Sequence, residues 1–290
     1  MEAIVRAEDV RSVGVVGCGL MGSGIVEVCA RAGCAVTYVE PTQELVEAGR
    51  ARIERSVNKA VEHGKLERAD GPVVLGRISG ATELGALAGC DLVIEAATED
   101  LEAKLEVFRG LGAVTPTDIV LASNTSSIPI VELARATGRP ERVIGMHFFN
   151  PPPVMALLEL IPAITTSPET LAFAEAFGER LGKTTVVAKD HAGFIVNRLL
   201  CPFLNDAARL FDEGLATRED IDAAIFFGLR HPMGPLALMD LVGIDTCVHV
   251  ADVLFREFGD VRYKAPQVLR RMVAAGHLGR KTGRGFYEYD

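Results

Sequence analysis

The sequence contains no run that approaches 18 apolar residues, and its N-terminus, MEAIVRAEDV, has no apolar signal core. A membrane-spanning helix needs about 20 such residues, and a secretory leader needs a continuous apolar segment. The sequence also has no basic excess, because its formal net charge at pH 7 is −9. Nucleic-acid binding requires a basic face, so we expect no nucleic-acid and no membrane partner. We expect a cytoplasmic protein.

Cysteine is sparse and scattered, with no CxxC pair and no Cys/His cluster among its six positions. These are Cys18, Cys29, Cys34, Cys90, Cys201 and Cys247. Zinc sites and disulfide frameworks follow closer or more regular spacings. We interpret these cysteines as small core hydrophobes in a reducing compartment, and we predict no metal site.

Length and patterning favour two domains, because 290 residues exceed a typical single domain. Short apolar strand-like segments alternate with helix-compatible ones in the first part of the chain. The strand-like segments are 13–16, 35–39, 91–94, 119–122 and 143–146. Such alternation predicts right-handed βαβ units around a parallel sheet. The later pattern is helical, so we place the domain boundary after Lys189.

The second part, 190–290, is expected to be a smaller all-α domain. Helical spacing of apolar residues predicts one helix over 194–211 and another over 236–258, and Thr217 is typical of the N-cap of a third. One face of the first helix is apolar, with Leu199, Leu200, Phe203 and Leu204. This face packs either against a second subunit or within the domain's own core. We expect a homodimer formed through this domain.

A glycine-rich turn, Gly17-Cys18-Gly19-Leu20-Met21-Gly22, follows the first expected strand and opens a helix. In such a turn Gly17 permits the tight bend, Gly19 lets a pyrophosphate approach the backbone, and Gly22 allows close packing of helix on strand. The N–H groups of the helix that begins around Leu20 and Met21 attract phosphates. The turn therefore predicts a Rossmann-type dinucleotide-binding domain over 1–189.

The expected second strand ends at an acidic residue, Glu40. A carboxylate at this position accepts hydrogen bonds from the ribose hydroxyls of the adenosine. Its negative charge repels a 2′-phosphate. We therefore predict NAD as the cofactor in preference to NADP.

Polar residues in costly positions mark the stretch from Ser123 to Glu159. Ser123-Asn124-Thr125-Ser126-Ser127 follows an apolar run, His147 lies among aromatics, and Glu159 interrupts Leu157-Leu158-Glu159-Leu160-Ile161. Each such group would cost a few kcal/mol if it were buried without a partner. We infer that these groups satisfy one another or a ligand, as in an active site.

The spacing of His147 and Glu159 suggests how they meet. Pro151-Pro152-Pro153 excludes a helix between them, and strands flanking that turn would bring the two side chains face to face. Glu159 would then accept a hydrogen bond from one ring nitrogen of His147, stabilise the imidazolium, and leave the other nitrogen to take a proton. The alternative is a core histidine with a structural hydrogen bond.

Several motifs together resemble the L-3-hydroxyacyl-CoA dehydrogenase family over roughly residues 11–289. They are the glycine-rich turn, Ser123-Asn124-Thr125-Ser126-Ser127, His147-Phe148-Phe149-Asn150-Pro151, Gly193-Phe194-Ile195-Val196-Asn197-Arg198, His231-Pro232-Met233-Gly234-Pro235 and 279–287. The resemblance implies reversible, NAD-dependent oxidation of a short (S)-3-hydroxyacyl-CoA, with 3-hydroxybutyryl-CoA giving acetoacetyl-CoA as the expected reaction. No stretch remains for a fused hydratase domain, so we expect a stand-alone enzyme of fatty acid metabolism.

The resemblance also implies residue roles. His147 is the general base at the C3 hydroxyl, Glu159 holds it, and Ser126 with Asn197 donates hydrogen bonds to the substrate oxygen. The implied cofactor contacts beyond the glycine-rich turn are Glu40, Glu99, Lys104, Ser126, Asn150 and Lys281. The implied CoA contacts are Ser56 and Ser126. For Glu99 and Lys104, the residues alone are equally typical of a solvated helix face.

One departure from the family pattern concerns CoA. A lysine expected about two turns beyond Ser56 is replaced by His63, although Lys59 and Lys65 are close. The same chemistry on a carrier-bound acyl group, or on a sugar acid such as gulonate, therefore remains an alternative. A non-catalytic, crystallin-like role is a further alternative, against which His147, Glu159, Ser126 and Asn197 argue together.

Overall fold

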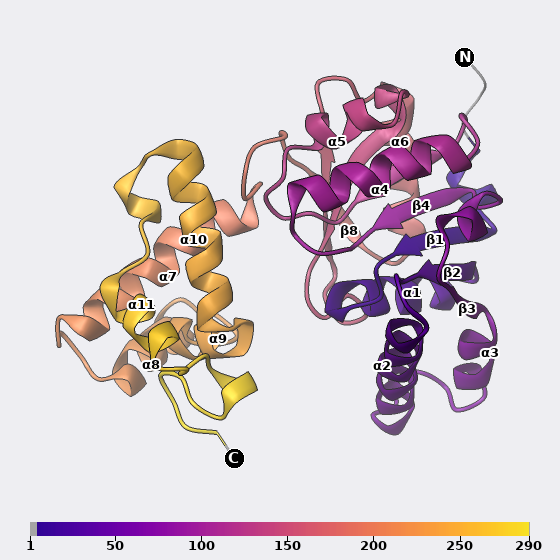
Figure 1. Cartoon of the computed structure of the whole chain (residues 1–290). Helices are drawn as coiled ribbons and strands as arrows, with labels where there is room; N and C mark the ends of the chain where they lie inside the picture. Colours follow the sequence, from indigo (N-terminus) through magenta and orange to yellow (C-terminus); the bar gives the residue numbers. More distant parts are fainter. Residues whose placement is uncertain (1–4, 290) are drawn as a thin grey trace. The chain divides into compact units, whose positions relative to one another are not determined.

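The protein is described by a computed structural model over residues 5–289, so the first four residues of the N-terminal segment considered above lie outside the described part. Within the described residues, no helix has the length and apolar character required to cross a membrane. The chain forms two compact units, one ending at His191 and the other beginning at Ala192 (Figure 1).

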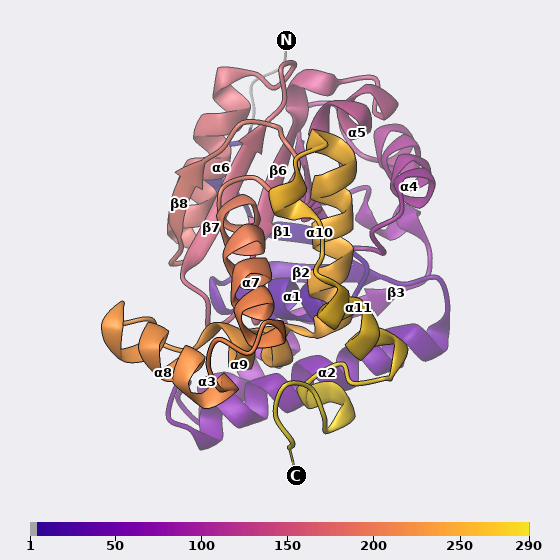
Figure 2. The same ribbon diagram turned by 90° about the vertical axis from the view of Figure 1, so that its left-hand side faces the viewer.

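The first unit is built on an eight-stranded sheet in the order β3-β2-β1-β4-β5-β6-β7-β8. All neighbouring strands are parallel except β6 and β7, which are antiparallel. The strands are β1 Ser12–Val16, β2 Ala35–Val39, β3 Ile78–Ala81, β4 Leu92–Glu95, β5 Val120–Ser123, β6 Val143–Phe148, β7 Leu157–Pro162 and β8 Thr184–Val187. Figure 2 shows β7 and β8 side by side at one edge. This doubly wound arrangement, with a helical unit after it, confirms the predicted fold class.

Helices connect the strands and cover the sheet. They are α1 Leu20–Arg31, α2 Gln43–Glu62, α3 Asp70–Gly76, α4 Leu101–Val114, α5 Ile130–Ala136 and α6 Pro168–Arg180, with short 3₁₀ turns at Ala7–Asp9, Leu84–Leu87 and Pro140–Arg142. Val13 and Val15 of β1 share a core cluster with Ile25 of α1 and Phe177 of α6. Both faces of a parallel sheet are covered by helices, so the side chains on both faces of each strand are buried. The strand sequences are therefore continuous apolar runs.

The glycine-rich turn joins β1 directly to α1. Gly17 adopts a φ of +87°, which favours glycine. A Cβ on Gly22 would lie 1.9 Å from the carbonyl oxygen of Gly17, whereas a Cβ on Gly19 would meet no atom within 4 Å. The turn lies where the strand order reverses between β1 and β4, the usual ligand-binding edge of such sheets.

The second unit is helical, with α7 Val196–Asp212, α8 Arg218–Gly228, α9 Pro235–Val242, α10 Ile244–Phe258 and α11 Gln267–Ala274, and 3₁₀ turns at Val261–Tyr263 and Arg280–Thr282. The predicted single helix over 236–258 is wrong. Gly243, with φ of 103°, ends α9 and starts α10. The helix predicted from residue 194 begins at Val196, because Gly193 and Phe194 have positive φ values of 76° and 44°. Thr217 caps α8 by accepting the N–H of Asp220 at 3.1 Å, as expected.

The apolar face of α7 divides between two environments. Leu204 is buried in the core of the helical unit, and Leu200 and Phe203 pack against that core. Leu199 is 70% exposed. Most of this face therefore belongs to the unit's own core, and only Leu199 is left for another partner.

Gly22→Ala is expected to lower the free energy of unfolding by about 1–3 kcal/mol, the usual cost of overpacking. The added methyl group would collide with a backbone oxygen, which cannot rotate away. Gly19→Ala is the matched control and should cost much less. Urea unfolding followed by circular dichroism measures both, and equal losses would contradict the close approach of Gly22 to Gly17.

Candidate active site

The structure pairs His147 with Glu159 across the only antiparallel strand pair described. The two residues are directly opposite in the β6–β7 register, and His147 Nδ1 lies 2.8 Å from Glu159 Oε2. His147 is 7% exposed and Glu159 is fully buried. Because a carboxylate only accepts, Nδ1 carries the proton in this contact and Nε2 is the basic nitrogen of the neutral ring. The geometry expected from the spacing is present.

The turn between β6 and β7 is fixed by two contacts that hold the pair in register. Lys183 Nζ donates to the carbonyl oxygens of Pro152 at 2.6 Å and Met155 at 2.8 Å. Pro152 also packs on α1, where a Cβ on Gly24 would lie 2.5 Å from its ring. Burial lowers the pKa of Lys183, and the charge of Arg31 lowers it further. Sequence analysis missed this lysine, because nothing local links it to the prolines.

The polar segment after β5, residues 124–127, forms a loop held by Glu99. Its Oε1 accepts the Thr125 hydroxyl at 2.6 Å, the Ser126 and Ser127 amides at 2.9 and 3.1 Å, and their hydroxyls at 3.3 and 3.0 Å. Burial raises the pKa of Glu99, but the Lys104 charge and these donors outweigh it, so the pKa is lowered. The carboxylate therefore stays ionised at neutral pH and orients the half-buried Ser126.

The same loop is tied to the strand that carries the histidine. Asn124 Oδ1 accepts the backbone N–H of Phe148, the residue after His147, at 2.8 Å. The ring of Phe149 lies edge-on to the imidazole, with centroids 4.7 Å apart. Ser126 and His147 are therefore held on neighbouring strand ends, at the carboxyl edge of the sheet.

Glu95, at the end of β4, is a buried carboxylate that sequence analysis missed. It accepts Lys104 Nζ at 2.5 Å, the Ser123 hydroxyl at 2.6 Å and the Ala97 amide at 2.7 Å. Lys104 Nζ also lies 3.5 Å from Glu99 Oε2. Glu95 ends an apolar strand just as Glu159 interrupts one, so the same reasoning could have found it.

Lys104 is 1% exposed, and Glu99 is held by the loop described above. The interpretation as a solvated helix face is therefore wrong for Lys104, whereas Glu99 is an exposed residue that precedes α4. Lys104 lies in the first turn of α4, and its ammonium group lies between the carboxylates of Glu95 and Glu99.

Glu40 lies beside the glycine-rich turn, where its Oε1 accepts the Cys18 amide at 2.5 Å. Burial, and secondarily Glu40, raises the pKa of the Cys18 thiol to about 12. This thiol is consequently protonated at neutral pH and is no nucleophile. The turn thus presents backbone amides and one carboxylate, the set that recognises a dinucleotide.

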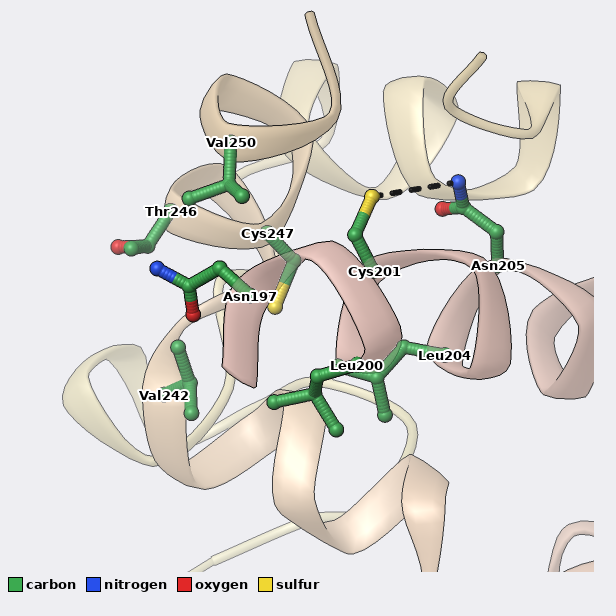
Figure 3. A pocket seen from close by; sticks show the side chains of 9 residues that line it. All are labelled: Asn197, Leu200, Cys201, Leu204, Asn205, Val242, Thr246, Cys247 and Val250. Carbon is green, nitrogen blue, oxygen red and sulfur yellow. Dashed lines mark hydrogen bonds between the residues drawn. The ribbon is translucent and has the colours of Figure 1, made fainter. Parts of the chain in front are cut away.

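The other residues expected in the site take no part in the contacts described above. Ser56 is exposed on α2, and Asn150 is exposed two residues after the end of β6. Asn197 and Lys281 belong to the helical unit. Lys281 Nζ forms an ion pair with Asp245 at 2.5 Å. Asn197 lines a pocket formed by α7, α9 and α10, together with Leu200, Val242 and Thr246 (Figure 3).

Two family models match the chain. The model described as "3-hydroxyacyl-CoA dehydrogenase, NAD binding domain" covers residues 12–191, and that described as "3-hydroxyacyl-CoA dehydrogenase, C-terminal domain" covers residues 193–289. The 3-hydroxybutyryl-CoA dehydrogenase of Mycobacterium tuberculosis H37Rv is 50% identical over 285 residues, which are 98% of this chain and 100% of that protein. The mitochondrial hydroxyacyl-coenzyme A dehydrogenase of Sus scrofa is 39% identical, over 97% of this chain and 91% of that protein.

Solved structures show the same similarity. The crystal structure of M. tuberculosis FadB2 superposes with a TM-score of 0.94 at 49% identity, covering 100% of both chains. The (S)-3-hydroxybutyryl-CoA dehydrogenase PaaH1 of Ralstonia eutropha gives 0.91 at 46% identity, covering 97% of this chain and 99% of that chain.

Lys104→Met is expected to lower the free energy of unfolding by about 3–5 kcal/mol, because it leaves Glu95 buried without its cation. The double variant Glu95→Gln/Lys104→Met should lose less than the sum of the two single variants, since no charge then stays unpaired. Urea unfolding of the four proteins measures the coupling. Strict additivity would show that the pair does not interact energetically.

Proposed function

Since this chain belongs to the 3-hydroxyacyl-CoA dehydrogenase family, whose cofactor is NAD, we propose that it interconverts (S)-3-hydroxybutyryl-CoA and acetoacetyl-CoA. The observation that carries this proposal is the buried His147–Glu159 pair beside the Glu99-held serine loop. An alcohol oxidation needs a base and hydrogen-bond donors at the same oxygen, and these neighbouring strand ends supply both.

The residues of the glycine-rich turn fit the cofactor. A Cβ on Gly19 would meet no atom within 4 Å, so a ligand can approach the backbone there. The backbone amides at the start of α1, including those of Leu20 and Met21, can donate hydrogen bonds to a pyrophosphate. Glu40, beside the turn, would take the ribose hydroxyls. NAD, when bound, supplies the hydride acceptor, and the protein supplies orientation and proton handling.

His147 acts as the general base in this proposal. Its Nε2 takes the proton of the C3 hydroxyl as hydride leaves C3, and Glu159 stabilises the imidazolium through Nδ1–H. In the reverse direction the same imidazolium returns the proton. Ser126 and Asn197 donate hydrogen bonds to the oxygen at which negative charge develops.

Further contacts follow from the family resemblance. We propose that Glu99, Asn150 and Lys281 contact the cofactor and that Ser56, with Ser126, contacts CoA. We assign Lys104 to an indirect role through Glu99, because its ammonium lies between Glu95 and Glu99 and is almost wholly buried.

We also propose that the residues after Lys189 form the substrate and dimerisation domain of a cytoplasmic homodimer. Support comes from large apolar side chains exposed on the helical unit, including Leu199 at 70% and Phe227 at 77%. A role in fatty acid metabolism follows from the proposed substrate.

The proposed reaction predicts that the protein consumes NADH in the presence of acetoacetyl-CoA. The decay of NADH absorbance measures the rate, with carrier-bound acetoacetate and the keto acid derived from gulonate as comparison substrates. Absence of decay with acetoacetyl-CoA at every pH tested would refute the proposal. Decay with the carrier-bound substrate alone would transfer the same chemistry to that substrate.

His147→Gln is expected to lower kcat by about 10²–10⁴-fold, the usual contribution of a general base, without weakening NADH binding. Glu159→Gln should lower kcat less, because it keeps the base but removes the charge that stabilises its protonated form. Steady-state rates and fluorescence titration with NADH separate the two effects. Lost NADH affinity in either variant would mean that the pair is structural.

A further inference from the structure

Arg52 of α2 is a half-buried cation at the glycine-rich turn. Its Nη1 donates to the carbonyl oxygen of Cys18 at 3.4 Å, while the amide of Cys18 donates to Glu40. The helix packs closely here, since a Cβ on Gly49 would lie 2.8 Å from the Cys18 sulfur. Arg52 thus contacts the backbone carbonyl group of Cys18, and Glu40 contacts the backbone amide of the same residue.

The Arg52 guanidinium is weakly engaged compared with its neighbour Arg50. Arg50 pairs with Glu54 at 2.7 Å and donates to the carbonyl oxygens of Leu75 and Ile78. Within residues 5–289, Arg52 forms only the long hydrogen bond to Cys18 and no ion pair with a carboxylate. Most of its five N–H donors therefore remain for a ligand.

Arg52 also begins a polar stripe along α2. Ser56, Lys59 and His63 follow at i+4, i+7 and i+11, which places all four residues on one side of the helix, and the last three are exposed. His63 Nδ1 lies 2.8 Å from the Lys59 carbonyl oxygen, so the ring is fixed at the helix end. In a chain of net charge −9, Arg52 and Lys59 give this stripe local positive charge, which attracts anions.

We propose that Arg52 binds a phosphate monoester carried on an adenosine ribose. Two nucleotides of this chemistry concern the protein, the 2′-phosphate of NADP(H) and the 3′-phosphate of CoA. The guanidinium fork matches a phosphate in a bidentate fashion, which a lysine cannot do. Beside Glu40, such a contact would offset the repulsion of a 2′-phosphate and make NADPH a second usable cofactor.

The choice of nucleotides rests on the proposed function, but the test does not require turnover. Calorimetry gives Kd for NADPH and NADH, and for CoA and 3′-dephospho-CoA, with the wild type, Arg52→Gln and Arg52→Lys. Arg109→Gln is the matched control. Arg109 is exposed on α4 of the same unit, and its substitution by glutamine removes the same positive charge as Arg52→Gln. NADH consumption with acetoacetyl-CoA is measured separately, so failure of the proposed function is recognised independently.

Arg52→Gln is expected to raise Kd for one phosphorylated nucleotide roughly 10-fold or more relative to its unphosphorylated counterpart, as loss of a charged hydrogen bond does. Arg52→Lys should give an intermediate loss, and Arg109→Gln none. A change in the NADPH/NADH ratio assigns the site to the cofactor, and a change in the CoA/dephospho-CoA ratio assigns it to the substrate. If neither ratio moves, or if all four nucleotides weaken equally, the proposal is wrong.

Discussion

Glu159 has no exposed surface, and His147 donates a hydrogen bond to its buried carboxylate at 2.8 Å. An unpaired charge in this position would cost several kcal/mol. The pairing also fixes strand register, since a slip of one residue between β6 and β7 would turn Glu159 to the other face of the sheet. The hydrogen bond between His147 and Glu159 therefore ties the orientation of the imidazole to the pairing of β6 with β7.

A second buried carboxylate serves the neighbouring strand ends. Glu95 accepts hydrogen bonds from Lys104, Ser123 and the Ala97 amide. Lys104 also forms an ion pair with Glu99, which holds the serine loop. Strands β4, β5 and β6 thus end in groups that satisfy one another's charge and hydrogen bonds. This explains how a loop rich in hydroxyl groups keeps a defined shape at the edge of an apolar sheet.

Local patterns predicted most of this arrangement. The glycine-rich turn and the alternation of strands and helices gave the α/β unit, and three prolines with a carboxylate in an apolar strand indicated the His147–Glu159 contact. The Glu95–Lys104 pair and the Lys183 contacts join segments far apart in the chain, so they follow from the folded sheet and not from spacing. The break at Gly243 was missed because apolar periodicity continues through it, and only its φ of 103° separates the two helices.

The oxygen Oε1 of Glu99 receives five donors, more than its lone pairs can serve equally. The longest of these contacts, at 3.3 Å, is the Ser126 hydroxyl. That hydroxyl can rotate toward an incoming oxygen while the remaining four donors keep the carboxylate solvated by protein. Reorientation of the serine hydroxyl would therefore cost the loop almost none of its internal hydrogen bonds, and the loop backbone would keep its shape.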